Sequence, residues 1–230
     1  MSDGDVIELA ESSEVGRRLG RHIEHDARSR NFPAIVAPIA DIKHLRHRAP
    51  FDQGTLGSCT GNAMAGALMT APYYESSRIV AESNAVLLYE SATRLDKVPG
   101  KYPPDDTGST GLAVAKAAKR DGYISAYSHA FGLQHALGAL TVAPVITGIN
   151  WYTSFDSPLP TGECPFTADA TVRGGHEVEL FGIDVEKSQI WAYQSWGATW
   201  GGLGNGTFWF SYATFERLLS EKGDVTAFVA

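Results

Sequence analysis

Apolar residues gather into helix-like runs in the first half of the chain. The run TGNAMAGALMTA, rich in alanine, methionine and leucine, directly follows Cys59. We expect a buried helix that begins near this cysteine and ends near Pro72, because proline cannot continue a helix. Further helices are predicted at residues 84–94, 112–120 (capped by Ser109 or Thr110) and 131–140.

After Thr141 the pattern changes to short apolar runs separated by glycine, proline and polar turns. The runs VAPVITGINW, HEVELFGID, QIWAYQSWG and GTFWFSYA are typical of strands. Helices in the first half and strands in the second predict an α+β chain with two packed subdomains. The expected domain spans residues 32–230, with a helical lobe at about 50–140 and a β lobe made of about 32–49 plus 141–230.

Residues 1–31 look like an appendage to this domain. Val15, Leu19 and Ile23 recur every four residues, which predicts a short amphipathic helix after Ser13. Two interpretations stay open: a surface helix or partly ordered tail, and a regulatory segment that lies on the body of the protein.

Composition narrows the function classes. The chain has 230 residues and a net charge of -7, which argues against nucleic acid as the main partner because phosphate binding needs a basic surface. No apolar stretch is long enough to cross a bilayer and no signal-peptide core is present, so we expect a cytoplasmic protein without a membrane partner. The pattern shows no metal-ligand spacing or phosphate loop, and no cofactor is expected.

The chain has only two cysteines, Cys59 and Cys164, which fits a reducing compartment, although the sequence leaves open whether they pair. Cys59 sits where a glycine-rich loop becomes a helix, and the unpaired N–H groups and positive dipole end of the first turn favour a thiolate there. His176 follows Gly174 and Gly175, which suit a wall against which a peptide lies. A cysteine and a histidine from different lobes are what nucleophilic thiol catalysis needs.

Three blocks of the sequence resemble the papain-like cysteine peptidases, and most of all the bacterial and phage-type branch without a long pro-domain. We therefore expect no activation by removal of a large pro-domain. The blocks are QGTLGSC (residues 53–59), GGHEV (174–178, followed by Gly182 and Asp184), and QSWG (194–197, followed by WG at 200–201 and GNGTF at 204–208).

The resemblance implies a fold and a mechanism. The fold would have a helical left lobe and a β-rich, barrel-like right lobe with the active-site cleft between them. Cys59 would attack the scissile carbonyl, His176 would carry the proton, Gln194 would orient the imidazole, and Gln53 with the Cys59 N–H would form the oxyanion hole. The remaining expected substrate-binding residues are Gly57, Ser58, Thr107, Gly108, Gly174, Gly175, Glu177 and Trp196, the last packing over the hydrogen bond that orients His176.

Some positions depart from the family pattern. Gln194 stands where the family has asparagine, and it carries the same amide on a longer arm. Leu56 replaces a disulfide partner, which agrees with a reducing environment, and nothing in the sequence explains Thr60 in place of an aromatic residue.

Glu177 occupies a position where the resemblance implies a small residue that lines the pocket for the second side chain before the scissile bond. A carboxylate there must either pair or meet a basic ligand. We weigh an internal ion pair, with Arg173 or a lysine of the other lobe, against a preference for Arg or Lys in the substrate.

The predicted function is a cysteine-type peptidase acting on polypeptides. Two alternatives remain: a catalytically impaired binding protein of the same fold, and a thiol acyltransferase or amidase that acts on a non-peptide amide. The presence of Gln53, Cys59 and His176 together argues against a decayed site.

Overall fold

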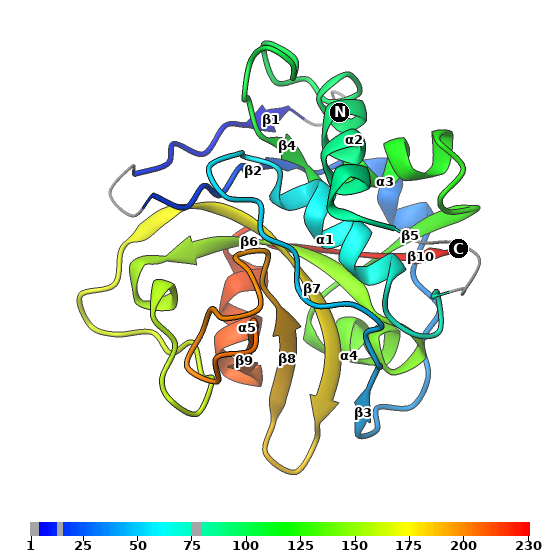
Figure 1. Ribbon diagram of the computed structural model, residues 1–230. Coiled ribbons are helices and arrows are strands. Elements are labelled where there is room, and N and C mark those ends of the chain that lie inside the picture. Colours follow the sequence, from blue (N-terminus) through cyan, green and yellow to red (C-terminus); the bar gives the residue numbers. More distant parts are fainter. Residues whose placement is uncertain (1–4, 13–15, 75–79) are drawn as a thin grey trace.

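A computed structural model describes residues 5–12, 16–74 and 80–230. Within these residues the chain forms five α-helices and ten strands (Figure 1). Three helices gather on one side, and a twisted sheet with two further helices makes up the other.

The helices α1 (Cys59–Leu68), α2 (Glu82–Thr93) and α3 (Gly111–Arg120) share one apolar cluster with each other. All three lie where the sequence predicted them, to within two residues at each end except the C-terminus of α1. The predicted cap of α3 is Thr110, whose side chain accepts a hydrogen bond from the N–H of Ala113 at 3.0 Å.

The larger sheet has seven strands, in the order β5-β10-β6-β7-β8-β9 with β3 paired to β7. Within the described residues this path is open, because β5 and β9 end it without pairing to each other, so the barrel-like lobe expected from the resemblance is an open sheet. The strands are β3 Ile42–Lys43, β5 Ala126–Ala130, β6 Val145–Tyr152, β7 Val172–Asp184, β8 Gln189–Tyr193, β9 Thr207–Ser211 and β10 Asp224–Val229.

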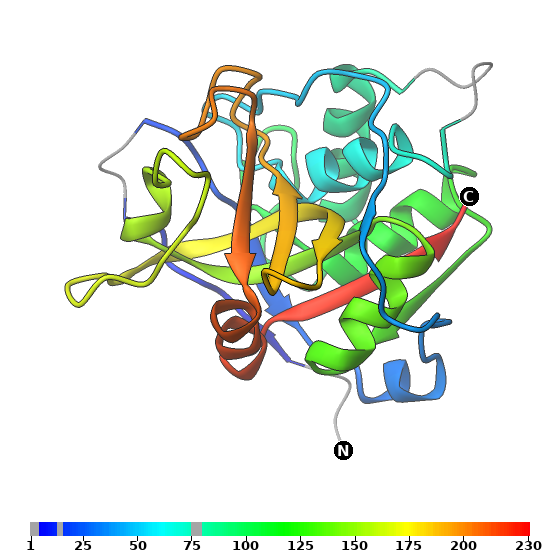
Figure 2. The same ribbon diagram turned by 90° about the horizontal axis from the view of Figure 1, so that it is seen from below.

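Two helices, α4 (Leu133–Val142) and α5 (Tyr212–Ser220), pack into the apolar cluster of this sheet. Seen from below, β10 runs from beside α5 to the edge that carries the C-terminus (Figure 2). The sequence analysis did not identify α5, although Ser211 is a typical cap residue and accepts a hydrogen bond from the Thr214 N–H at 3.1 Å.

The N-terminal segment (residues 5–12 and 16–24) forms a small second sheet with the main body. Its strands β1 (Val6–Ile7) and β2 (Arg21–Glu24) pair antiparallel, and β2 pairs in parallel with β4 (Ser109–Thr110). The predicted helix after Ser13 is therefore wrong for residues 16–24, which are extended, while residues 13–15 lie outside the described residues. A short 3-10 helix, Ala27–Asn31, follows.

Glycine explains why the helical spacing misleads in this segment. Gly16 and Gly20 have φ angles of +67° and +114°, which interrupt a right-handed helix. The apolar side chain of Leu19 is fully buried in the core of the sheet region instead of lying on one face of a helix.

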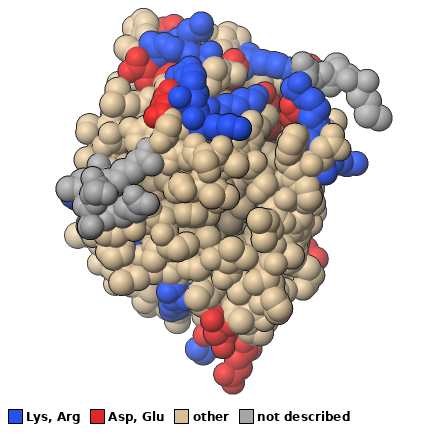
Figure 3. Space-filling model, turned by 90° about the vertical axis from the view of Figure 1, so that its right-hand side faces the viewer, with Lys and Arg blue, Asp and Glu red and all other residues tan. Residues whose placement is uncertain are grey.

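No helix among the described residues is long and apolar enough to span a membrane. Figure 3 shows a face whose centre carries few charged side chains, with Lys and Arg gathered toward the end where Figure 1 places α2 and α3.

Candidate active site

Cys59 is the first residue of α1 and is fully buried. The loop before it is held by Asp106, whose two carboxylate oxygens each accept a hydrogen bond from the Gly57 N–H at 3.0 Å. Ser58 precedes the helix, and its hydroxyl accepts a hydrogen bond from the Asn62 side chain at 3.0 Å. These contacts fix the start of α1 and therefore the position of the thiol.

His176 lies on β7, the strand against which α1 packs, and it is also fully buried. Its Nε2 lies 2.5 Å from Oε1 of Gln194. The backbone N–H of Ser195 donates to the same Oε1 at 2.9 Å, which identifies this atom as the amide oxygen. His176 therefore carries its proton on Nε2, and Nδ1 has no hydrogen-bond partner among the described residues.

Aromatic rings hold the imidazole from two sides. Trp196 stacks on His176 with ring centroids 5.2 Å apart, and Trp151 meets it edge-on at 5.0 Å. Both indoles therefore contact the ring of His176 and limit the directions in which it can turn.

Gln53 is buried, and its side-chain amide is fixed at both ends. Its Oε1 accepts a hydrogen bond from the hydroxyl of Ser195 at 2.5 Å. Its Nε2 donates to the carbonyl of Leu56 at 2.8 Å and to the carbonyl of Leu19, in the N-terminal segment, at 3.1 Å. The amide that the sequence assigns to the oxyanion hole therefore already binds a peptide carbonyl.

The N-terminal segment lies along the other residues expected to bind substrate. The N–H of Ser109, beside Thr107 and Gly108, donates to the carbonyl of Gly20 at 2.8 Å. The carbonyl of Thr107 accepts a hydrogen bond from His22 Nε2 at 2.7 Å, because Nδ1 of that ring already accepts from the Leu9 N–H.

Three glycines that the sequence analysis expects to bind substrate, Gly108, Gly174 and Gly175, lie in close contact with the N-terminal segment. A Cβ at Gly175 would lie 2.1 Å from the carbonyl oxygen of Arg21, and one at Gly174 would lie 2.8 Å from Leu19. At Gly108 it would lie 2.4 Å from the Gly20 carbonyl. Gly175 and Gly108 need glycine because a backbone carbonyl lies directly against them, whereas the atom close to Gly174 belongs to the side chain of Leu19.

Burial shifts the pKa values of both Cys59 and His176. Burial raises the pKa of the Cys59 thiol well above its usual range, and the nearby N–H of Glu177 opposes this only in part. Burial lowers the pKa of His176 to about 3. In this covered form the pair is a neutral thiol and a neutral imidazole, so the thiolate expected from the helix N-terminus is not favoured here.

The surroundings of Glu177 differ from the ion pair with Arg173 or a lysine that the sequence analysis considered. Arg173 is not its partner, because Arg173 pairs with Asp156 at 3.3 Å and Glu11 at 3.5 Å. The cation beside Glu177 is Arg21 of the N-terminal segment, a residue that the sequence analysis did not consider. The sequence analysis also did not identify Asp224, the partner of Arg21, because no local pattern indicates which side chains of β10 lie near Glu177.

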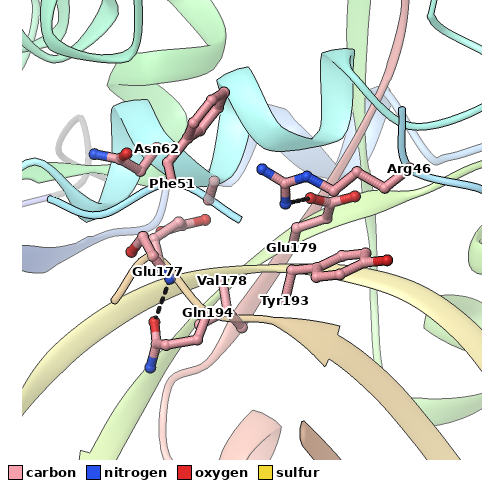
Figure 4. Close-up of a pocket in the computed structure, with 10 residues that line it drawn as sticks. Arg46, Phe51, Asn62, Glu177, Val178, Glu179, Tyr193 and Gln194 are labelled. Carbon is pink, nitrogen blue, oxygen red and sulfur yellow. Dashed lines mark hydrogen bonds and ion pairs between the residues drawn. The ribbon is translucent and has the colours of Figure 1, made fainter. Parts of the chain in front are cut away.

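A small enclosed cavity adjoins the site. Figure 4 shows its lining, with Phe51 and Asn62 on the α1 side and the ion pair of Arg46 and Glu179 near Tyr193. Its volume is about 10 Å³, which is room for roughly one water molecule.

The remaining chemistry-bearing groups are accounted for. Cys59 and Cys164 are both free thiols, which answers the question of their pairing for this structure. Among the described residues, no three His, Cys, Asp or Glu side chains come together in a way that would hold a metal ion.

Known structures share this architecture. Xylellain, a cysteine protease from Xylella fastidiosa, superposes with a TM-score of 0.72 at 19% identity, covering 96% of this chain and 99% of that one. Digestive procathepsin L 3 of Tenebrio molitor larval midgut gives 0.62 at 12% identity, covering 97% and 84%. Procathepsin B S9 from Trypanosoma congolense gives 0.63 at 12% identity, covering 94% and 87%.

Sequence comparison alone finds no relative. No family model matches the chain, and no curated protein matches it significantly. The likeness therefore lies in the arrangement of helices and strands over nearly the whole length. This chain has the fold of the papain-like cysteine proteases.

Proposed function

We propose that this protein is a cysteine peptidase that hydrolyses polypeptides through Cys59 and His176. The observation that carries the proposal is the bond from Gln53 Nε2 to the Leu19 carbonyl, beside a cysteine at the start of α1 and an oriented histidine. A peptide carbonyl at this position is where the substrate carbonyl must lie for attack by the thiol.

The steps follow from the hydrogen bonds. His176 uses Nε2 for Gln194, so Nδ1 takes the proton of the Cys59 thiol, and the sulfur attacks the carbonyl carbon. The oxyanion accepts hydrogen bonds from Gln53 and from the Cys59 N–H. The C–N bond then breaks as His176 returns its proton to the leaving amine, which leaves an acyl-thioester. Water, deprotonated by His176, hydrolyses the thioester and restores the thiol.

Peptides can reach these groups only after the N-terminal segment moves. Leu19 and Arg21 now occupy the wall at Gly174 and Gly175, and both reactive groups are inaccessible to water. We infer that the segment is regulatory, the second of the two interpretations that the sequence left open.

The test is peptide cleavage under reducing conditions by the full chain and by Cys59→Ala, each with a segment-loosening substitution, Gly20→Ala. We expect thiol-dependent cleavage that chelators leave unchanged and that Cys59→Ala abolishes. Cleavage that survives Cys59→Ala would overturn the mechanism. Alkylation of Cys59 by iodoacetamide without cleavage of any peptide would favour the impaired or non-peptide alternatives.

A further inference from the structure

The peptide group between Leu56 and Gly57 links the side-chain amide of Gln53 to a carboxylate. Its carbonyl accepts a hydrogen bond from Gln53 Nε2 at 2.8 Å. Its N–H donates to both carboxylate oxygens of Asp106 at 3.0 Å. A trans peptide group is planar, and its C=O and N–H point in opposite directions. Asp106 therefore holds the plane of this group, and the plane decides where the carbonyl meets Gln53.

Asp106 comes this close because residue 57 is a glycine. A Cβ at Gly57 would lie 2.8 Å from Asp106 Oδ1, so a larger residue would push the carboxylate away. A hydrogen bond to a charged acceptor is about twice as strong as one between neutral groups. The charge also polarises the peptide group, which makes the carbonyl at its other end a better acceptor for Gln53.

A buried phenol holds Asp106 in this position. Tyr89 of α2 is fully buried, and its hydroxyl donates to Asp106 Oδ1 at 2.7 Å. The same hydroxyl accepts a hydrogen bond from the Gly108 N–H at 2.9 Å. Burial and the bond to Asp106 raise the pKa of Tyr89, so the phenol stays neutral and keeps its donor. The carboxylate is thus fixed by a helix of the domain.

The N-terminal segment adds only a weak contact to Asp106. Arg18 Nη2 lies 3.5 Å from Asp106 Oδ2, and the Arg18 side chain is 43% exposed, so solvent screens this pair. The bonds to Gly57 and Tyr89 do not involve the segment. Asp106 therefore keeps its contact with the peptide group when the segment moves aside.

The amide of Gln53 carries two N–H groups with different tasks. One donates to the Leu56 carbonyl, and the other reaches the Leu19 carbonyl at 3.1 Å, the position proposed for the oxyanion. Both N–H groups lie in one rigid plane, so fixing the first also fixes the direction of the second. An oxyanion needs its donor at about 2.7–3.1 Å. The bond to Leu56 therefore matters for the rate.

We propose that Asp106 is a positioning residue that acts on Gln53 through the peptide group between Leu56 and Gly57 and so aligns the donor for the oxyanion. Its carboxylate does not bind the substrate in this role. The effect on the rate rests on the proposed peptidase function, whereas the chain of hydrogen bonds from Asp106 to Gln53 does not.

The kinetic test compares Asp106→Ala with Asp105→Ala, both on the Gly20→Ala chain. Asp105 is the exposed neighbouring carboxylate and serves as the matched control. Asp106→Ala should lower kcat by about tenfold or more and change KM by less than about twofold, because the bond to the oxyanion strengthens only as the charge forms. Asp106→Asn, which keeps an uncharged acceptor, should recover part of the loss. A rise in KM at constant kcat would overturn the proposal.

A second substitution separates this role from a purely structural one. Gln53→Ala removes the donor itself, so adding Asp106→Ala to it should lower kcat by no more than about twofold further. An equal loss with and without Gln53 would overturn the proposal. If Asp106→Ala does not fold, Tyr89→Phe takes its place in both comparisons, because it removes a donor that holds the carboxylate.

Alkylation of Cys59 by iodoacetamide forms no oxyanion and therefore reports on the thiol alone. Its rate on the Gly20→Ala chain should be the same with Asp106→Ala as with Asp105→Ala. A slower reaction with Asp106→Ala alone would show that the carboxylate acts on the thiol, which would contradict the proposal.

Amide hydrogen exchange, measured by NMR on the full chain, tests the hydrogen bonds without catalysis. The side-chain signals of Gln53, identified by their loss in Gln53→Ala, should exchange at least about tenfold faster in Asp106→Ala than in Asp105→Ala. Equal exchange rates would overturn the proposal. Faster exchange in a protein that cleaves no peptide would uphold the link from Asp106 to Gln53 and overturn the peptidase function instead.

Discussion

At the scale of single residues, Gln194 reaches the ring of His176 although its side chain is longer than that of asparagine. Its amide oxygen accepts hydrogen bonds from His176 Nε2 and from the N–H of the next residue, Ser195. The second bond bends the side chain back toward its own backbone. This bend compensates for the one methylene by which glutamine is longer than asparagine. Gln194 therefore presents an acceptor to the ring although the family pattern has the shorter asparagine.

Gln194→Ala should lower kcat by about ten- to a hundredfold, a cost of roughly 1.4–2.7 kcal/mol, because the ring loses the partner that fixes its tautomer. Gln194→Glu is the matched control: it keeps the acceptor and adds a charge that should raise the pKa of His176 and shift the pH profile. Both are measured on the Gly20→Ala chain. Unchanged kinetics in Gln194→Ala would leave this residue with a packing role only.

Local motifs single out Cys59, His176 and Gln53 as candidate site residues, because each stands in a short sequence pattern. Arg21 and Asp224 could not be predicted in the same way. They meet at Glu177 only because β2 and β10 both pack near β7, and nothing near either residue in the sequence indicates that contact.

At the scale of elements, a buried ion pair joins the chain before α1 to β7. Arg46 Nη1 lies 2.8 Å from Glu179 Oε2, and Thr70 Oγ1 donates to Glu179 Oε1 at 2.5 Å. The side chains of Arg46 and Glu179 are 4% and 1% exposed, so solvent screens the pair little. The pair therefore holds the segment around Arg46 against β7.

Arg46→Met should destabilise the protein by about 3–5 kcal/mol, because it leaves the Glu179 carboxylate buried without its cation. The double variant Arg46→Met/Glu179→Leu should recover most of this loss, since an apolar pair of similar volume removes the uncompensated charge. Urea unfolding measures both. A single variant as stable as the wild type would show that the pair contributes nothing to stability.

The elements themselves could be predicted to different degrees. The helices α1 and α3 stand out in the sequence because they are alanine-rich. The helix predicted in the N-terminal segment is wrong, since the spacing of Leu19 and Ile23 suits a helix while Gly20 between them and the pairing of β2 with β4 favour an extended chain. No rule of local sequence shows that a segment will be stabilised by a surface folded from the rest of the chain.

At the scale of the whole molecule, Gly20 controls how the N-terminal segment fits. A Cβ there would lie 2.2 Å from the backbone oxygen of Gly57, whereas one at Gly16 would meet nothing within 4 Å. Both glycines have positive φ angles, so alanine strains the backbone at either position, and only Gly20→Ala adds a clash.

Gly20→Ala should therefore speed the alkylation of Cys59 by about ten- to a hundredfold, which corresponds to a clash of roughly 1–3 kcal/mol. Gly16→Ala is the matched control and should change the rate little. Iodoacetamide labelling followed by mass spectrometry gives both rates. Equal rates in the two variants would contradict a covering role for this part of the segment.

The buried histidine also links stability to pH. The pKa of His176 is about 3 in the folded chain against an ordinary value of 6.5, so below 6.5 the unfolded chain binds a proton that the folded chain does not. Its contribution is fully present above pH 6.5 and is lost toward pH 3, by about 1.4 kcal/mol per pH unit.

Urea unfolding of the wild type and of His176→Gln at pH 7 and pH 4.5 isolates this contribution, because the other titrating groups are common to both proteins. The wild type should lose more stability on acidification than the variant. Parallel losses would mean that the ring is protonated in the folded chain over this range.

The parallel pairing of β2 with β4 has a kinetic consequence. The segment is tethered, so its effective concentration at the cleft is fixed by the chain, on the order of millimolar for short connections, and does not change on dilution. The fraction of molecules in which the segment covers the site therefore does not depend on protein concentration. A ligand that binds at the same place must compete with a segment that cannot diffuse away. Cutting the chain between β2 and the body would turn this first-order equilibrium into a bimolecular one, and the same segment would then dissociate at low protein concentration.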